Sequence, residues 1–173
     1  MPSTATQRHT NPGVEGPDAP PRTLLVAGAH GGAGSTTLAK LLHPALDMGT
    51  VSGTPKPGRA PLQPRGRPVV VVSRNTVSAA WHATRAVTAI DACRDETDGH
   101  IAALVIVSDG GRSEPKEATA RFALLQGRVC GVVRMPFIPA LRLVDDPTTV
   151  ELPVKARQVL DAVKELAFRR PCH

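Results

Sequence analysis

A run of eight residues near the N-terminal end has the types and spacing of a loop that binds phosphate. The run consists of His30, Gly31, Gly32, Ala33, Gly34, Ser35, Thr36 and Thr37. Its glycines permit positive φ, so that successive backbone N–H groups and the start of a helix can approach an anion closely. Thr36 occupies the position whose hydroxyl can bind Mg²⁺. We therefore expect these eight residues to hold the phosphates of a nucleotide.

The loop departs from the usual phosphate-binding pattern at its charged position. When G-x-x-x-x-G-K-[ST] is aligned on Gly34, Ser35 stands where lysine is expected. A charge-assisted contact is worth roughly 1.5 to 3 kcal/mol, so its loss would weaken binding about ten- to a hundredfold. Hydrolysis suffers more, because phosphoryl transfer depends on positioned positive charge and a metal ion. The alternatives are weak nucleotide binding, hydrolysis by other groups, or a tight turn that keeps only the architecture.

Two further side chains could supply the missing chemistry. His30 either brings a positive charge to the phosphates or is a neutral loop residue. Asp109 follows an apolar segment, so it could join Thr36 as a ligand of Mg²⁺, which prefers oxygen ligands. The alternative interpretation of residues 108–111 (Ser-Asp-Gly-Gly) is a simple turn.

Alternating apolar segments and amphipathic segments must position these residues. The apolar segments predict strands at 24–27, 69–72, 101–107 and 129–133. Helices are predicted from 35 to about 42, from a cap at Asn75 or Thr76 to about 94, from 114 to 126 with Ser113 as cap, and from 154 to 168. This order predicts an α/β fold of three layers, with a mostly parallel sheet flanked by helices.

The length and composition of the chain indicate its domain organisation. The chain of 173 residues with 41% hydrophobic content can form one α/β domain, which we place at 23–168. Residues 1–22 are too polar to bury a core and predict a disordered N-terminal tail, and 169–173 form a C-terminal tail. Aromatic residues make up only 2% of the chain, which argues against stacking platforms for bases.

A basic connector interrupts the predicted domain at 49–68. It contains five prolines, four basic residues and no acidic residue. Such a composition predicts an extended, solvated linker, or alternatively a segment that contacts DNA or an acidic partner through its positive charges.

The cysteines and the apolar segments limit the location of the protein. Three cysteines without C-x-x-C spacing support neither a disulfide framework nor a zinc site. No signal-peptide region is evident, and no apolar run approaches the length that spans a bilayer. We expect a cytoplasmic protein without membrane insertion.

Together with the loop, three later segments carry a resemblance to a known family. They are 69–73 (VVVVS), 101–109 (IAALVIVSD) and 132–139 (VVRMPFIP). Over residues 23–168 the chain resembles the MinD/ParA family of deviant P-loop ATPases, whose loop reads K-G-G-x-G-K-T-T. Both family lysines are missing here, at His30 and Ser35. Ser108 and Asp109 stand where the family has a base-reading asparagine, and the connector replaces the section that carries the family's switch and magnesium aspartates.

The resemblance implies ATP or ADP with Mg²⁺ as ligands, with Thr37 near the α-phosphate. It also implies a homodimer or a protein partner, and a role in plasmid maintenance, conjugation or cell organisation. We therefore expect a degenerate member of the family, a weak nucleotide binder or pseudo-ATPase that acts through protein contacts. One alternative is an active ATPase that uses His30 and Asp109 or a partner's arginine. Another is a DNA-associated accessory protein that uses the basic connector.

Overall fold

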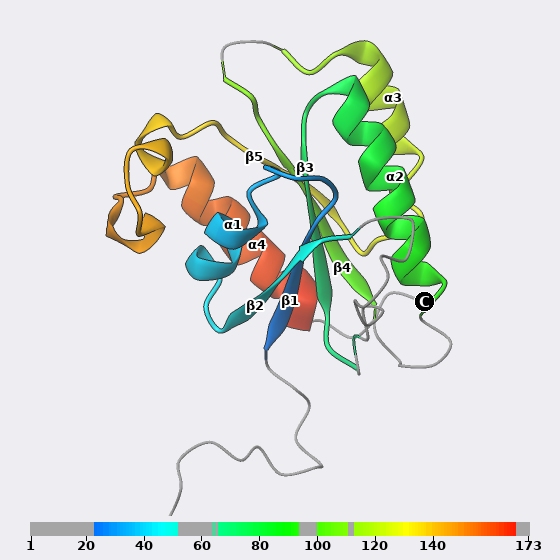
Figure 1. Cartoon of the computed structure of the whole chain (residues 1–173), viewed down its shortest axis with the longest axis horizontal. Coiled ribbons are helices and arrows are strands. Elements are labelled where there is room, and N and C mark those ends of the chain that lie inside the picture. Colours follow the sequence, from blue (N-terminus) through cyan, green and yellow to red (C-terminus); the bar gives the residue numbers. More distant parts are fainter. Residues whose placement is uncertain (1–22, 52–63, 65, 94–99, 111–112, 169–173) are drawn as a thin grey trace, which may run out of the picture.

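The sheet of the molecule is entirely parallel. The computed structural model describes residues 23–51, 64, 66–93, 100–110 and 113–168, so the predicted tails and most of the connector lie outside the described residues. The strands are β1 (Leu24–Gly28), β2 (Ala45–Thr50), β3 (Val69–Arg74), β4 (Ile101–Val107) and β5 (Val132–Met135). They are arranged in the order β2-β1-β3-β4-β5 (Figure 1), and each neighbouring pair is parallel.

Helices cover both faces of this sheet. In the described part of the chain they are α1 (Ser35–Leu41), α2 (Val77–Asp91), α3 (Lys116–Ala123) and α4 (Val154–Phe168), together with the 3₁₀ turns η2 (Pro139–Arg142) and η3 (Pro147–Thr149). Helices α1 and α4 lie on one face, and α2 and α3 lie side by side on the other (Figure 1). The predicted fold class, a three-layer α/β fold with a parallel sheet, is confirmed.

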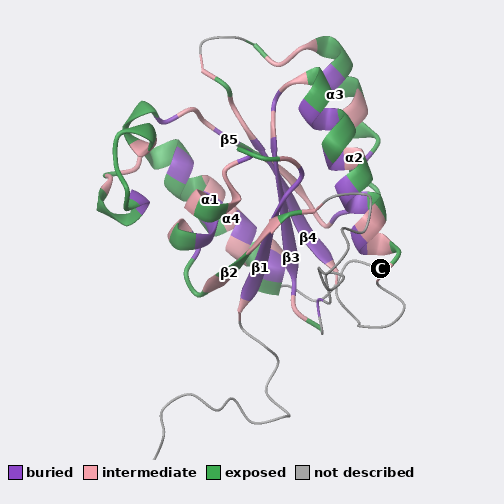
Figure 2. Ribbon diagram, in the orientation of Figure 1, coloured by how far each residue is buried: buried purple, intermediate pink, exposed green. Residues whose placement is uncertain are grey.

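Burial of both sheet faces explains why the central strands β1, β3 and β4 begin with continuous apolar runs. In β1, Leu24 and Val26 pack into the core beneath α1 and α4, whereas Leu25 and Ala27 pack into the core beneath α2 and α3. This alternation follows from the two-residue period of a strand. The purple strands in the middle of Figure 2 show that the centre of the sheet is buried from both sides.

The largest difference from the predicted elements is β2. No strand was predicted at 45–50, and the connector was predicted to begin at 49, but Ala45–Thr50 pairs with β1, with Val26 opposite Asp47. This strand lies at the edge of the sheet, and Leu46 and Asp47 are exposed. An edge strand needs no continuous apolar run, which is why its sequence gives little signal.

Element ends also differ from the prediction. Helix α3 ends at Ala123, not at Gln126, and its N-cap is Pro115, not Ser113. Strand β5 begins at Val132, three residues later than expected. Thr76, one of the two expected caps, does cap α2 through a hydrogen bond from the backbone N–H of Ala79.

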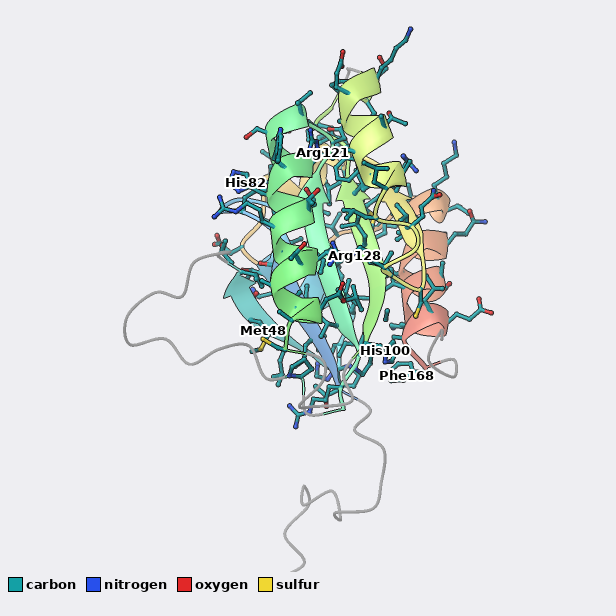
Figure 3. All side chains as sticks on the ribbon, turned by 90° about the vertical axis from the view of Figure 1, so that its right-hand side faces the viewer. Met48, His82, His100, Arg121, Arg128 and Phe168 are labelled. Atoms are coloured by element: carbon teal, nitrogen blue, oxygen red, sulfur yellow. The ribbon has the colours of Figure 1, made fainter. Side chains whose placement is uncertain are left out.

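Small residues form much of the buried face of α2. Val77, at the start of the helix, is 38% exposed, whereas Ala79, Ala80, Ala83 and Ala86 are buried. Trp81 is also exposed, and the guanidinium of Arg121 lies over its ring at 3.6 Å. Figure 3 shows Arg121 between α2 and α3 and His82 on the opposite side of α2.

In the part of the chain that the structure describes, no helix combines the length and the apolar character needed to cross a bilayer.

Candidate functional site

The candidate site lies at the carboxyl ends of the parallel strands. Helix α1 follows β1 on one face of the sheet, and α2 follows β3 on the other face. Since β1 and β3 are neighbours, their connections diverge at this point. Such divergence opens a crevice beyond the strand ends, where α/β proteins bind ligands.

The segment between β1 and α1, residues 29–34, is the glycine loop. Gly32 has φ of 75° and Gly34 has φ of 101°, both in the left-handed region that side chains other than glycine rarely adopt. Ala33, between them, is only 1% exposed. A Cβ atom added at Gly31, Gly32 or Gly34 would meet no atom within 4 Å, so the surface of the loop is open at these three positions.

His30 connects this loop to the end of β3 through hydrogen bonds of its side chain. Its Nδ1 donates to the carbonyl of Gly31 at 2.9 Å, and its Nε2 accepts from the backbone N–H of Arg74 at 3.3 Å. These partners fit the neutral imidazole with its proton on Nδ1, a tautomer assigned from the contacts. The ring also lies beside that of His82, with 5.8 Å between the centroids. Of the two predicted roles, the contacts favour a neutral loop residue.

The first turn of α1 presents Ser35, Thr36 and Thr37 next to the loop. The hydroxyl of Thr36 donates to a carboxylate oxygen of Asp47 in β2 at 2.5 Å. The other oxygen of this carboxylate accepts from the backbone N–H of Gly49 at 2.8 Å. Asp47 was missed by the sequence analysis, because the strand that positions it was missed.

Asp109, the predicted metal ligand, has cationic partners instead of Thr36. Its carboxylate lies 3.1 Å from Nη1 of Arg74 and 3.7 Å from Nη2 of Arg142, and its backbone N–H donates to Asn75. Among the described residues, no group of three or more His, Cys, Asp or Glu side chains could hold a metal ion. The structure therefore pairs Thr36 with Asp47 and places Asp109 between two arginines.

Arg74 is a second residue that the sequence analysis missed. It ends β3, and its Nε donates to the carbonyl of Gly32 at 3.3 Å. Its side chain is only 22% exposed. A positive charge thus lies directly against the glycine loop, although the loop itself contains no lysine.

An apolar pocket of about 110 Å³ begins at the glycine loop. Its lining combines loop and α1 residues, the last residues of β3, β4 and β5, and the segment after β5. The lining residues are Ala33, Gly34, Thr37, Leu38, Leu41, Arg74, Val107, Met135, Pro136, Phe137, Ile138, Leu141 and Arg142. Among these residues, the guanidinium of Arg142 lies 4.9 Å from the centre of the Phe137 ring. The lining of the pocket is therefore mostly apolar, with two arginines, Arg74 and Arg142, among its residues.

Comparisons of the chain with family models, curated proteins and solved structures gave no match. The fold and the site define a three-layer α/β protein with a glycine loop and an adjacent pocket. Membership of the MinD/ParA family stays a prediction from the sequence.

Proposed function

We propose that this protein binds a nucleotide such as ATP or ADP weakly and acts through protein contacts, as a degenerate relative of the MinD/ParA ATPases. The observation that carries the proposal is the continuity of the pocket with the glycine loop. Ala33, Gly34 and Thr37, from the loop and the first turn of α1, line the pocket together with mostly apolar side chains. A ligand with an anionic part and a flat apolar part would match the loop and the pocket.

The phosphates would lie over the glycine loop. Its backbone conformation at Gly32 and Gly34 supports close approach of N–H groups to an anion. The base would enter the apolar pocket, where Phe137 and Leu38 offer contact surface. Pockets with a mostly apolar lining and few polar groups are typical sites for small molecules.

Thr36 and Asp47 are suitable residues to hold Mg²⁺ with the phosphates. They provide a hydroxyl and a carboxylate that already lie in contact at 2.5 Å. Mg²⁺ is usually bound by one or two carboxylates together with substrate phosphates and water, so this donor set fits the ion. The bound Mg²⁺ would neutralise part of the negative charge of the phosphates. Asp47 thereby takes the role that the sequence analysis gave to Asp109.

Several features favour binding without turnover. The run from His30 to Thr37 contains no lysine or arginine, and both ring nitrogens of His30 contact the main chain. Hydrolysis requires charge positioned on the transferred phosphate, which these residues do not offer. The cytoplasmic location, the homodimer or protein partner, and the role in DNA maintenance or cell organisation belong to this proposal through the family resemblance.

Equilibrium titration with a fluorescent ATP analogue and Mg²⁺ tests nucleotide binding. Gly31→Asp adds a carboxylate at a position where a Cβ meets no atom, so it opposes phosphate without steric conflict. Gly31→Ala is the matched neutral control. We expect saturable binding that falls at least about tenfold in Gly31→Asp and less than about twofold in Gly31→Ala. Absence of saturation in the wild type, or equal affinity in all three proteins, would contradict the proposal.

Release of inorganic phosphate from ATP tests the second part of the proposal. We expect no release above the background of the buffer, alone or with DNA. Turnover that disappears in Thr36→Ala would instead establish the active ATPase, because this substitution removes the hydroxyl that contacts Asp47.

A further inference from the structure

We propose that Arg74 supplies the positive charge that the glycine loop lacks, and that Asp109 is an internal counterion which phosphate displaces from it. This inference rests on the proposed function, since it names the residue that recognises the anionic part of the ligand. It concerns a side chain from β3, outside the loop and outside the run of eight residues predicted to bind phosphate.

The position of Arg74 suits this role. Its backbone N–H donates to His30 at one end of the loop, and its Nε donates to the carbonyl of Gly32 in the middle. Nη1 faces Asp109, and Nη2 carries two further N–H groups, because guanidinium has five donors in all. Arg74 also lines the pocket beside Gly34. A phosphate over the loop would therefore meet a guanidinium that these contacts already hold in position.

Asp109 competes with phosphate for the same guanidinium. Its side chain carries a single negative charge and is 52% exposed, and ion pairs of partly exposed side chains are weak. A polyphosphate carries several charges and forms bidentate contacts with arginine, so it would win this competition. Only the side chain of Asp109 needs to move in this exchange, because its backbone N–H is held by Asn75.

Arg142 makes the exchange possible without leaving an isolated charge. Its Nη2 lies 3.7 Å from the same carboxylate, and its side chain is 57% exposed. When Arg74 turns to phosphate, Asp109 therefore keeps a cationic partner and contact with water. The three side chains carry one net positive charge at the edge of the pocket, which also favours an anionic ligand.

The inference and the metal-ligand interpretation of Asp109 predict opposite effects. If Asp109 held Mg²⁺, Asp109→Asn would weaken nucleotide binding. If Asp109 is a displaceable counterion, Asp109→Asn frees Arg74 and strengthens binding. The gain must also disappear when Arg74 is absent, because the counterion acts only through Arg74.

The experiment measures binding of ATP, AMP and inorganic tripolyphosphate to the full chain by calorimetry. The variants are Arg74→Gln, Arg74→Lys, Asp109→Asn and the double variant Arg74→Gln with Asp109→Asn. Arg128→Gln and Asp91→Asn form the matched control, since Arg128 and Asp91 pair at 2.7 Å and neither lines the pocket. Thermal unfolding of every variant confirms that it is folded.

We expect Arg74→Gln to weaken ATP and tripolyphosphate about ten- to a hundredfold and AMP much less, with partial recovery in Arg74→Lys. Asp109→Asn should strengthen ATP severalfold, but only when Arg74 is present, and the control variants should bind as the wild type. Wild-type affinity in Arg74→Gln, or weaker binding in Asp109→Asn, would overturn the inference. If the protein binds tripolyphosphate but not ATP, the proposed nucleotide function is rejected and the inference about Arg74 stands. If it binds neither ligand, both are rejected.

Discussion

The hydroxyl of Thr36 and the carboxylate of Asp47 lie 2.5 Å apart, and this contact joins the first turn of α1 to the edge strand β2. The two residues are eleven positions apart in the chain, on elements that pack side by side. Asp47 also accepts from the backbone N–H of Gly49 in the same strand. One carboxylate therefore links the start of a helix to the local shape of a strand.

Replacing Asp47 should separate its structural role from its charge. Asp47→Ala removes both hydrogen bonds, so the free energy of unfolding should fall by about 1 to 2 kcal/mol in urea denaturation. Asp47→Asn keeps an acceptor and should cost less than about 1 kcal/mol, yet it should weaken the effect of Mg²⁺ on ATP binding. An unchanged dependence on Mg²⁺ in Asp47→Asn would show that Asp47 is structural only.

Gly110 is a position where backbone and packing both exclude a side chain. Its φ is 79°, and an added Cβ would lie 3.1 Å from the ring of Phe137, which lines the pocket. Gly110→Ala should therefore lower the free energy of unfolding by about 1 to 2 kcal/mol and disturb ligand binding. Gly127→Ala is the control, since its Cβ would meet no atom within 4 Å. Equal stability of the two variants in urea denaturation would contradict this prediction.

Phe122 anchors α3 to the sheet. It is 1% exposed and belongs to the core beneath α2 and α3. Phe122→Ala should lower the free energy of unfolding by about 3 to 5 kcal/mol, because it leaves a cavity in addition to the lost apolar contact. Leu124→Ala, two residues later and 79% exposed, should change it by less than about 0.5 kcal/mol. Chemical denaturation of both variants measures the difference.

The ion pair of Glu114 and Arg134 predicts a dependence of stability on pH. Partial burial raises the pKa of Glu114, but hydrogen bonds from Arg134 and Thr119 and the charge of Arg134 bring it below the ordinary value of 4.5. A lowered pKa in the folded state adds stability above about pH 4.5 and loses it as the pH falls through the folded pKa.

Thermal unfolding of Glu114→Gln tests this dependence. The wild type should have the higher Tm at pH 7, and the difference should shrink as the pH is lowered towards 3 and the carboxylate of Glu114 takes up a proton. Glu117→Gln changes an exposed carboxylate in the first turn of α3, three residues after Glu114, and serves as the control. A difference in Tm that stays constant between the two pH values would contradict the predicted role of the ion pair.

The parts of the fold that the sequence predicts are those buried on both faces. Residues 69–72 of β3 and Ile101–Val107 are continuous apolar runs because helices cover both sides of the sheet, and such runs predict buried strands. Ala45–Thr50 has no such run, since it lies at an edge and exposes Leu46 and Asp47. Patterns of apolar residues report burial, and they miss strands that are half covered.

The residues of the candidate site also differ in how far the sequence predicts them. The glycine loop has a local signature, because its glycines and the threonines at the start of α1 are consecutive in the chain. Arg74 and Asp47 have none, because each reaches the loop or α1 only through the pairing of strands. Asp109 was predicted as a candidate metal ligand, but its two arginine partners could not be predicted, since both lie more than thirty positions away in the chain.

The left-handed backbone of Gly32 and Gly34 sets which changes the loop can accept. Any other residue at these two positions strains the main chain, whereas Ser35, the first residue of α1, is under no such restriction. The shape of the turn therefore depends on the two glycines more than on the residue at position 35. A change of charge at that position would leave intact the backbone that faces a ligand, whereas a change at either glycine would not.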